Sequence, residues 1–379
     1  LGNYERFLDI TLNRDNNLTT GKVYSSVIER ERKGDYLGKT VQVVPHITNE
    51  IQDRIERIAH TPSDGSDETP DICVIELGGT VGDIESAPFV EALRQFQFRV
   101  GRENICFLHV SLVPVIGVVG EQKTKPTQHS VKGLMASGIQ PDFLVCRSSE
   151  PILSEVKTKL SLFCHVSENS VFSAHDVSNI YRVPMMLEEQ GATKEICKRL
   201  DLDLSTERPL LEEWGNLAQR MDELSGDVHI AMVGKYTGLS DSYLSVIKAL
   251  NHSALAEGVN LFIDWVEASD LETSNEGSET HSKSWDLVKA ADGILVPGGF
   301  GDRGIEGKIL AAQFARENKI PYLGVCLGLQ IATIEFARNV LGLAGANSTE
   351  FDEDTPHPTV IFMPEGSRTH MGGTMRLGS

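Results

Sequence analysis

A cysteine flanked by glycines is the residue of this sequence whose surroundings best suit chemistry. The segment PYLGVCLGLQ (321–330) leads an apolar run into a Gly-x-Cys-x-Gly turn centred on Cys326, and a helical pattern follows. Gly324 and Gly328 remove side chains that would crowd a strained turn between a strand and a helix, and a helix start favours the reactive thiolate. We therefore predict a nucleophile elbow that carries sulfur; the alternative is a buried structural cysteine in a strand.

A glycine-rich segment with three carboxylates forms a second candidate site. It follows the apolar run ICVIEL (72–77), which is typical of a strand buried on both faces. In a parallel sheet the carboxyl ends of the strands face the ligand crevice, so Glu76, Asp83 and Glu85 are well placed. The glycines let backbone N–H groups approach a ligand, and the carboxylates can bind a cation or ribose hydroxyls. We predict a nucleotide cleft; the alternative is a solvated loop.

The segment GEQKTKPTQHS supplies positive charge for an anion. Lys123 and Lys125 lie two positions apart, which puts two ammonium groups beside polyphosphate oxygens. Hydroxyl and amide groups accompany them at Thr124, Thr127, Gln128 and Ser130. Solubilising surface lysines are the alternative, but a chain with a net charge of −19 needs a local positive cluster to hold an anion. Together with the glycine-rich segment, the lysines favour a phosphate site.

The overall charge and the cysteine pattern exclude several classes of protein. The 379 residues include 35 basic and 54 acidic side chains, and this acidic balance repels nucleic acids and anionic membranes. The 6 cysteines contain no C-x-x-C pair, so neither a disulfide framework nor a zinc site is indicated. No apolar run approaches the ~20 residues of a membrane span. We expect a cytoplasmic protein that binds neither nucleic acid nor membranes.

Strand and helix patterns alternate along most of the chain. Strands are predicted at 41–44, 72–77, 105–113, 143–146, 171–174, 229–234, 261–266, 293–299 and in the run into Cys326, and helices at 47–58, 242–256 and 305–318. This alternation predicts an α/β protein with two doubly wound, mostly parallel sheets. The predicted ranges are a first domain at 1–205, a partly helical connector at 206–226, a second domain at 227–379 and a mobile loop at 268–284.

Several long segments resemble motifs of the CTP synthase family, and they occur in that family's order. They are ELGGTVGDIESAPF, EQKTKPTQHSVK, DVSNIYRVP, VGKYTGLSDSYLSVIKAL, LVPGGFGDRG, LGVCLGLQ, NSTEF and MGGTMRLG. The resemblance implies a P-loop-type synthase domain followed by a class I glutamine amidotransferase domain, which together make CTP from UTP, ATP and glutamine. In the family, ATP phosphorylates the uracil O4, a cysteine thioester releases ammonia from glutamine, and that ammonia displaces the phosphate at C4.

The resemblance also assigns roles to individual residues. Cys326 would attack glutamine, with oxyanion contacts from Gly299 and the backbone at Leu327. The implied glutamine-binding residues are Gly299, Leu327, Gly328, Leu329, Gln330 and Glu350. The implied nucleotide-binding residues are Asp83, Ile84 and Glu85 for CTP, Lys123, Thr124, Lys125, Pro126, Thr127, Gln128 and Lys159 for UTP and CTP, and His175, Asp176 and Val177 on the adenine side. Glu76 is implied as a ligand of Mg²⁺. Family members are further expected to be activated by GTP and to assemble into tetramers and filaments.

Two features of the family have no counterpart in these residues. The chain contains no G-x-x-x-x-G-K phosphate loop, and no His-x-Glu follows MGGTMRLG. His357 and His370 are the histidines after Cys326, and neither matches the family's base. We therefore expect an incomplete synthase domain and an incomplete amidotransferase domain, a stretch of a CTP synthase truncated at both ends. We expect this polypeptide alone to make no CTP, because loss of a catalytic partner removes orders of magnitude in rate.

Two other functions stay open at this point. The GVCLG elbow is shared by amidotransferases of several pathways, so a different acceptor of ammonia is one alternative, against which KTKPTQHS and GGTVGDIES argue. The other alternative is a catalytically silent protein that binds CTP and controls assembly, since the CTP-contacting residues are present while catalytic parts are missing. Binding of UTP and the response of the oligomeric state to CTP would separate these functions.

Overall fold

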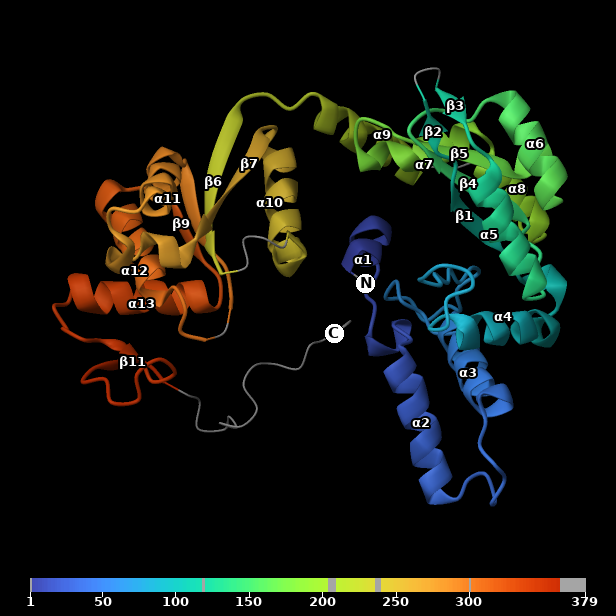
Figure 1. The fold of residues 1–379 in the computed structure, drawn as a ribbon, viewed down its shortest axis with the longest axis horizontal. Coiled ribbons are helices and arrows are strands. Elements are labelled where there is room, and N and C mark those ends of the chain that lie inside the picture. Colours follow the sequence, from blue (N-terminus) through green and yellow to red (C-terminus); the bar gives the residue numbers. More distant parts are fainter. Residues whose placement is uncertain (1, 118–119, 204–208, 236–239, 300, 362–379) are drawn as a thin grey trace. The chain divides into compact units, whose positions relative to one another are not determined.

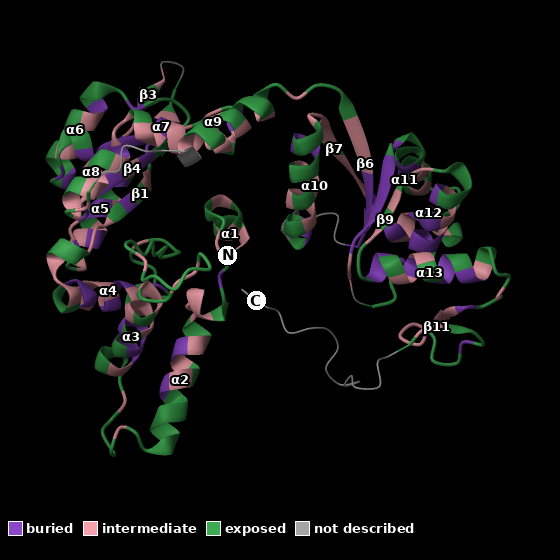
Figure 2. Cartoon of the chain, turned by 180° about the vertical axis from the view of Figure 1, so that it is seen from behind, coloured by how far each residue is buried: buried purple, intermediate pink, exposed green. Residues whose placement is uncertain are grey.

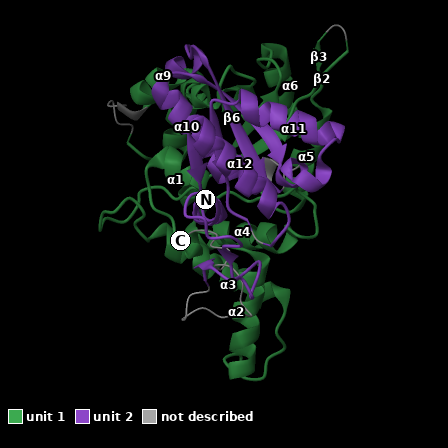
Figure 3. Cartoon of the chain, turned by 90° about the vertical axis from the view of Figure 1, so that its left-hand side faces the viewer, with its two compact units in different colours: residues 1–218, 374–379 green, residues 219–373 purple. Residues whose placement is uncertain are grey.

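The computed structural model describes residues 2–117, 120–203, 209–235, 240–299 and 301–361. The chain divides into two compact units, Leu1–Ala218 with Thr374–Ser379 and Gln219–Gly373 (Figure 3). The boundary falls within the helix α9 (Pro209–Asp222), inside the stretch predicted as a connector. The three predicted domain ranges stay predictions. Each unit is described separately below.

The first unit contains a three-stranded parallel sheet with the strand order β1, β4, β5. Its strands are Leu108–Leu112 (β1), Phe143–Ser148 (β4) and Val171–His175 (β5), beside the short antiparallel pair Val115–Ile116 (β2) and Glu121–Gln122 (β3). Its helices are Gly2–Leu8 (α1), Thr20–Lys33 (α2), Thr48–Ala59 (α3), Ala87–Val100 (α4), Lys125–Ala136 (α5), Ser154–Cys164 (α6), Val183–Glu189 (α7) and Ala192–Arg199 (α8), followed by α9 (Figure 1).

Helices cover both faces of this sheet because its strand residues alternate between two apolar clusters. Leu144 and Cys146 of β4 point into a cluster built with α5 and α6. Phe143 of β4 and Phe172 of β5 stack with a ring separation of 5.6 Å in a second cluster, which α7 and α8 complete. The sheet is therefore the middle layer of a three-layer α/β arrangement, as parallel sheets require.

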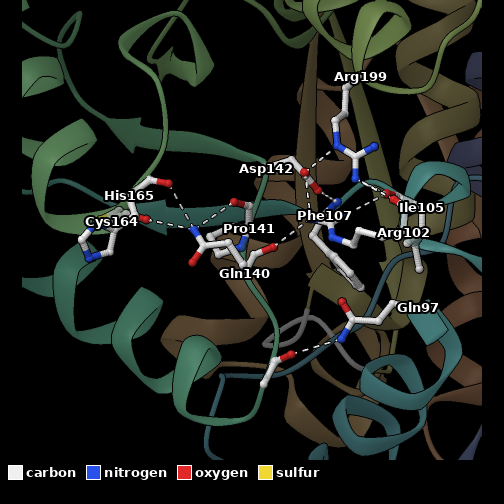
Figure 4. Close-up of polar contacts among 11 residues, drawn as sticks. Gln97, Arg102, Ile105, Phe107, Gln140, Pro141, Asp142, Cys164, His165 and Arg199 are labelled. Carbon is white, nitrogen blue, oxygen red and sulfur yellow. Dashed lines mark hydrogen bonds and ion pairs between the residues drawn. The ribbon is translucent and has the colours of Figure 1, made fainter.

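One largely buried carboxylate links the loops around the start of β4 (Figure 4). Asp142, whose side chain is 11% exposed, accepts hydrogen bonds from Arg102 at 2.8 Å and from Arg199 of α8 at 2.7 Å. Its second oxygen accepts the Phe107 N–H at 2.7 Å. Arg199 also donates to the carbonyl groups of Arg102 and Ile105. The carboxylate thus joins α8 to the segment that enters β1.

The second unit is built on a four-stranded parallel sheet with the order β7, β6, β8, β9. Its strands are Asp227–Gly234 (β6), Asn260–Glu267 (β7), Gly293–Val296 (β8) and Tyr322–Gly324 (β9), and a small pair is formed by Asn347–Ser348 (β10) and Pro358–Val360 (β11). Its helices are Leu244–Glu257 (α10), Glu279–Ala290 (α11), Ile305–Asn318 (α12) and Leu327–Asn339 (α13) (Figure 1). α11 and α12 pack on one face of the sheet, and α10 packs on the other.

The helices α12 and α13 are fastened to each other. Ile305, Ile309 and Ala312 of α12 pack against Leu327, Ile331 and Ile334 of α13 in one cluster, and Figure 2 colours these core residues purple. Beside this cluster, Arg316 of α12 donates to both oxygens of Glu335 of α13, with its shortest bond at 2.8 Å. Glu335 is only 3% exposed, whereas the Arg316 side chain is 35% exposed, so the ion pair lies at the edge of the core.

Two strands predicted in the first unit are absent. Residues 72–77 form no strand, and most of their apolar side chains are exposed, up to 84% for Val74. Residues 43–47 form a kinked turn that leads into α3, with Val44 extended at φ −107° and ψ 120°, instead of the strand predicted at 41–44. Pro45 cannot donate a hydrogen bond to a sheet, and no described segment pairs with 72–77, so neither run can be a strand of a sheet here. The other predicted strands and helices are present, and the α/β fold with mostly parallel sheets is confirmed.

The segment predicted as a mobile loop, 268–284, is largely ordered into turns and helix. It contains 3₁₀ turns at Ala268–Leu271 and Thr273–Asn275 and the first part of α11. Ala268 and Leu271 are fully buried, and they anchor the segment in the core of the second unit. The Ser278 hydroxyl accepts the His281 N–H at 3.1 Å and caps α11. Two buried apolar side chains and one cap therefore order a segment that is otherwise polar.

Candidate active site

Cys326 lies on a sharp turn between β9 and α13. Its backbone angles, φ 54° and ψ −106°, are rare for a residue with a side chain, and α13 begins at the next residue, Leu327. The thiol is exposed rather than packed in a strand. A strained turn that lifts a side chain off the end of a parallel sheet at a helix start is the geometry of a nucleophile elbow.

The two glycines that flank Cys326 allow this turn to close. A Cβ added to Gly324 would lie 2.3 Å from the carbonyl carbon and oxygen of Gly328. A Cβ added to Gly328 would lie 2.1 Å from the carbonyl oxygen of Val296 in β8. Both separations are far below any real contact, so backbone must approach backbone at both positions. The sequence pattern Gly-x-Cys-x-Gly thus reflects a steric requirement on each side of the sulfur.

Residues 298, 299 and 301, which follow β8, are called the oxyanion loop after the role predicted for Gly299. A Cβ added to Gly298 would lie 3.3 Å from Cys326 Cβ and 3.8 Å from its sulfur, so the loop passes directly beside the thiol. Among the described residues, no hydrogen bond uses the N–H of Gly299 or of Leu327. Two N–H groups near a nucleophile are the donors that an oxyanion needs.

Other predicted glutamine-binding residues surround the elbow in different ways. Leu327 and Gly328 are buried in the first turn of α13, so they offer backbone groups only, whereas Leu329 is 64% exposed. The Tyr322 hydroxyl donates to the Gly328 carbonyl at 2.9 Å, and burial raises the pKa of that phenol. Gln330 is partly exposed. The Glu350 N–H is held by the Ser348 hydroxyl at 3.2 Å, and its charge reaches Lys235 near the oxyanion loop.

Of the two histidines that follow Cys326 in the sequence, the structure describes His357. His357 is exposed, and its backbone carbonyl accepts the Asn347 N–H at 3.2 Å where β10 and β11 pair. His370 lies outside the described residues. The roles that the sequence suggests for residues 326–330 and 350 stay predictions.

Two buried lysines beside the oxyanion loop were not found by sequence reasoning. Lys235 follows β6 and is 5% exposed, and Lys308 of α12 is 1% exposed. Burial lowers the pKa of Lys308 to about 8, and repulsion from Lys235 adds to the effect. The available signals were the lysine of GKY directly after a strand, and a lysine within the apolar face of the helix IEGKILAAQF. A hydropathy profile alone predicts that both lysines lie at the surface.

Replacing Lys308 with methionine is expected to stabilise the second unit by about 3 kcal/mol near neutral pH. The folded-state pKa of about 8 lies below the ordinary 10.5, so the unfolded chain binds the proton more tightly and the charged lysine destabilises the fold. This penalty is complete below pH of about 8 and fades as pH rises toward 10.5. Urea unfolding should therefore show a difference between variant and wild type that shrinks over this range.

The exposed Lys289 of α11 offers the matched control for this test. The substitution Lys289→Met should change the free energy of unfolding by no more than about 0.5 kcal/mol at any pH. Equal unfolding curves for Lys308→Met and wild type near neutral pH would contradict the expectation.

In the first unit, predicted nucleotide-binding residues lie at the carboxyl ends of the strands, where parallel sheets bind ligands. The chain leaves β1 through the β2–β3 hairpin and reaches Lys123, whose N–H donates to the Pro114 carbonyl at 2.9 Å. Lys125 begins α5, followed by Pro126. Asp176 and Val177 follow β5 directly, and His175 is its last residue.

Lys123 and Lys159 share one acidic neighbour. Lys123 forms an ion pair with Glu121 at 2.6 Å. This ammonium, and more weakly Lys159 of α6, hold the pKa of the Glu121 carboxyl below its usual range. Two lysines that the sequence separates by 36 positions therefore act on the same carboxylate. The structure brings together these two members of the predicted phosphate site.

The hydroxyls of this segment are engaged within the protein. Thr127 is fully buried, and it accepts from Ser111 at 3.0 Å and donates to the Leu112 carbonyl at 3.1 Å. Thr124 is 3% exposed and accepts a hydrogen bond from the Gln128 amide at 3.0 Å. The Thr127 contacts fix the start of α5 on β1, and the Thr124 contact lies within the first turn of α5. A contribution of the two threonines to phosphate binding stays a prediction, and the geometry favours their backbone N–H groups.

The glycine-rich segment lies against α5. Val81 contacts Gly133 of α5 and belongs to the cluster of Val90, Leu134 and Ile139. Asp83, Ile84 and Glu85 are exposed in the turn before α4, and the Ser86 hydroxyl closes this turn on the carbonyls of Thr80 and Asp83. The predicted CTP segment is therefore held beside the helix that carries Lys125 to Gln128.

Glu76 is exposed and offers one carboxylate for a metal. Within the described parts of the chain, no group of three histidine, cysteine, aspartate or glutamate side chains could hold a metal ion. Mg²⁺ commonly takes one or two carboxylates together with substrate phosphates and water. A single carboxylate fits that mode, and it does not fit a cage made by protein alone.

The end of β5 is tied to β4. The Asp176 carboxylate pairs with Arg147 of β4 at 2.7 Å, and the His175 ring lies 3.0 Å from the Ser173 hydroxyl. Ser148, the last residue of β4, has a buried hydroxyl with no partner among the described residues. Sequence reasoning missed Ser148, and no signal in its neighbourhood distinguishes it.

No described helix is long and apolar enough to cross a membrane.

Comparison with known proteins gives consistent matches to both units. Residues 1–202 match the family model "CTP synthase N-terminus", and residues 239–379 match "Glutamine amidotransferase class-I". The whole chain is 61% identical to a CTP synthase of Dictyostelium discoideum over 394 residues, 69% of that protein. It is 58% identical to CTP synthase 1 of Homo sapiens over 381 residues, 64% of that protein.

The chain thus spans about two thirds of the length of these curated relatives. Among solved structures, a glutaminase domain of Trypanosoma brucei CTP synthase with bound acivicin is 42% identical and covers 38% of this chain and 53% of its own, with a TM-score of 0.34. Two family models matched in order, together with identities of 58–61% along the entire chain, show that it belongs to the CTP synthase family.

Proposed function

We propose that this chain serves the glutamine-dependent amination of UTP to CTP. The observation that carries the proposal is the elbow that presents Cys326 beside Gly298, in a chain whose other unit gathers lysines at the carboxyl edge of a parallel sheet. Membership in the CTP synthase family supports glutamine as the nitrogen donor, and ATP and UTP as the other substrates.

In the second unit, the proposed step is the attack of the Cys326 sulfur on the carboxamide carbon of glutamine. A carbon–sulfur bond forms, the carbonyl electrons move onto oxygen, and the N–H groups of Gly299 and Leu327 stabilise the oxyanion. Collapse of this intermediate breaks the carbon–nitrogen bond, and the departing nitrogen takes up the proton that the thiol lost and leaves as ammonia. Water then hydrolyses the thioester to glutamate and restores the thiol. Glu350 supplies a carboxylate for the α-amino group of glutamine.

In the first unit, the proposed ligand is a pyrimidine triphosphate. Lys123, Lys125 and Lys159 would face its phosphates, and residues 83–85 would face the product CTP. His175, Asp176 and Val177 would contact the adenine side of ATP, which phosphorylates the uracil O4 so that ammonia can displace phosphate at C4. Glu76 would hold Mg²⁺ together with the phosphates, and the metal would supply charge neutralisation there.

Two tests on this chain decide the proposal. A diazoketone analogue of glutamine should add covalently to Cys326, seen by mass spectrometry of the peptide, and Cys326→Ala should abolish the adduct completely. Isothermal titration with MgUTP should show binding, and Lys123→Ala should weaken it by about tenfold because one phosphate contact is lost. Absence of the adduct in wild type would refute the amidotransferase role, and binding of another acceptor in preference to UTP would refute the proposed substrate.

Further statements about the chain stay predictions that rest on the family resemblance. They are activation by GTP, assembly into tetramers and filaments, a cytoplasmic location, and the inability of these 379 residues alone to make CTP. The cysteines are all free, which supports a reducing compartment. A change of oligomeric state on addition of CTP, measured by light scattering without any turnover, would favour the catalytically silent alternative.

A further inference from the structure

Lys235 contacts the oxyanion loop at Gly301, and it also contacts Arg303 and Tyr243. Its ammonium donates a hydrogen bond to the Gly301 carbonyl. Its backbone carbonyl accepts a bond from Arg303 at 2.5 Å, and its backbone N–H donates to the Tyr243 hydroxyl at 3.1 Å. Tyr243 is itself 6% exposed in the cluster that packs α10 on the sheet. The lysine therefore ties the loop after β8 to the end of β6 and to the core.

The position of this loop decides where the oxyanion donor lies. Gly298 already touches Cys326, with the distances of 3.3 and 3.8 Å for an added Cβ given above. Gly301 follows Gly299 by two residues, so a displacement of the Gly301 carbonyl moves the Gly299 N–H. An oxyanion donor contributes strongly only within a few tenths of an ångström of its best position.

Charged side chains of both signs surround the Lys235 ammonium. Burial lowers its pKa, and the charge of Arg303 adds to this effect. The carboxylates of Asp302, Glu350 and Glu267 favour the charged form. A charged donor on a carbonyl makes a stronger bond than a neutral one, especially where water is largely excluded. The bond from this ammonium to the Gly301 carbonyl and the surrounding carboxylates offset part of the cost of burying a charge here.

We propose that Lys235 is a positioning residue for the glutamine site, whose ammonium fixes the oxyanion loop beside the Cys326 sulfur through the Gly301 carbonyl. The catalytic consequence rests on the proposed function, whereas the positioning of the loop does not. Lys235 does not touch the sulfur itself and acts through Gly301.

The test compares Lys235→Met, Lys235→Arg and the control Lys289→Met, an exposed lysine of α11. Three quantities are measured: the rate at which the diazoketone analogue of glutamine labels Cys326, the rate at which iodoacetamide labels the same thiol, and amide hydrogen exchange in residues 298–303. The analogue depends on the oxyanion loop, whereas iodoacetamide only requires an accessible sulfur. Lys235→Gln replaces Lys235→Met if the latter does not fold.

We expect Lys235→Met to slow labelling by the analogue by about 10- to 100-fold, with labelling by iodoacetamide unchanged within about twofold. Exchange in 298–303 should accelerate by about tenfold. Lys235→Arg should restore most of both properties because it keeps a charged donor, and Lys289→Met should match wild type. Unchanged exchange and unchanged labelling ratios in Lys235→Met would overturn the proposal.

The same design separates failure of this inference from failure of the proposed function. If wild type reacts with iodoacetamide but never with the analogue, the amidotransferase role fails, and hydrogen exchange alone then decides whether Lys235 positions the loop. If wild type is labelled by the analogue and Lys235→Met is labelled equally fast, the role of the elbow stands and the role of Lys235 falls.

Discussion

Replacing Gly328 with alanine is expected to abolish labelling of Cys326 by a glutamine analogue and to destabilise the second unit by about 4 kcal/mol or more. The added Cβ would lie 2.1 Å from the Val296 carbonyl oxygen and 3.0 Å from its carbon. Val296 is fully buried in β8 and cannot withdraw, so α13 must move off the sheet and take the elbow with it. The measurements are peptide mass spectrometry after labelling and urea unfolding.

Gly215 provides the matched control for this substitution. It lies within α9, and an added Cβ would meet nothing within 4 Å. Gly215→Ala should therefore leave labelling unchanged and stabilise the helix by about 0.5–1 kcal/mol. If Gly328→Ala is labelled normally and is as stable as wild type, the prediction is wrong, and the backbone around Cys326 can move to accommodate a Cβ.

Asp142→Ala is expected to destabilise the first unit by about 1–3 kcal/mol, because removing a largely buried acceptor leaves its donors without a partner. Without the carboxylate, the side chains of Arg102 and Arg199 lose their shared acceptor and the Phe107 N–H loses its partner. Figure 4 shows how these groups converge on the one side chain. Hydrogen exchange of peptides from β1 and β4 measures the local loss directly, since a chain of two units need not unfold in one step.

Asp53 supplies the comparison for this prediction. Its carboxylate pairs with Arg99 at 2.6 Å, but the side chain is 55% exposed. Exposed pairs contribute about 0–1 kcal/mol, so Asp53→Ala should be almost silent although its ion pair is the shorter one. Equal losses for the two variants would mean that burial of Asp142 adds nothing to its importance.

The sequence predicted those strands that find partners within the chain. The apolar runs at 143–146 and 171–174 became β4 and β5, which pair with each other along their length. The run at 72–77 has the same composition, yet no described strand pairs with it, and its side chains stay exposed. Preference for strand is a preference for a pleated, covered surface, and periodicity does not tell whether such a surface exists.

The elbow could be predicted because its close backbone contacts require glycine at two positions of the sequence. Only glycine satisfies the approaches at 324 and 328, so the pattern around Cys326 is nearly a description of the backbone. The positions of Lys235 and Lys308 could not be predicted, because a buried lysine looks in the sequence like a surface one. Likewise, the sequence suggests the hydroxyls of Thr124 and Thr127 as phosphate ligands, whereas the fold uses the Thr127 hydroxyl to hold α5 on β1 and the Thr124 hydroxyl to accept the Gln128 amide.

The ion pair between Arg316 and Glu335 has a consequence for combining substitutions. This ion pair and the apolar cluster beside it fix α12, which carries Lys308, to α13, which follows Cys326. A substitution that changes the packing of α12 is therefore expected to affect α13 as well. In a double-mutant cycle, Lys308→Met and a substitution in the first turn of α13 should show a coupling free energy, whereas Lys308→Met and Asp142→Ala, in separate units, should simply add.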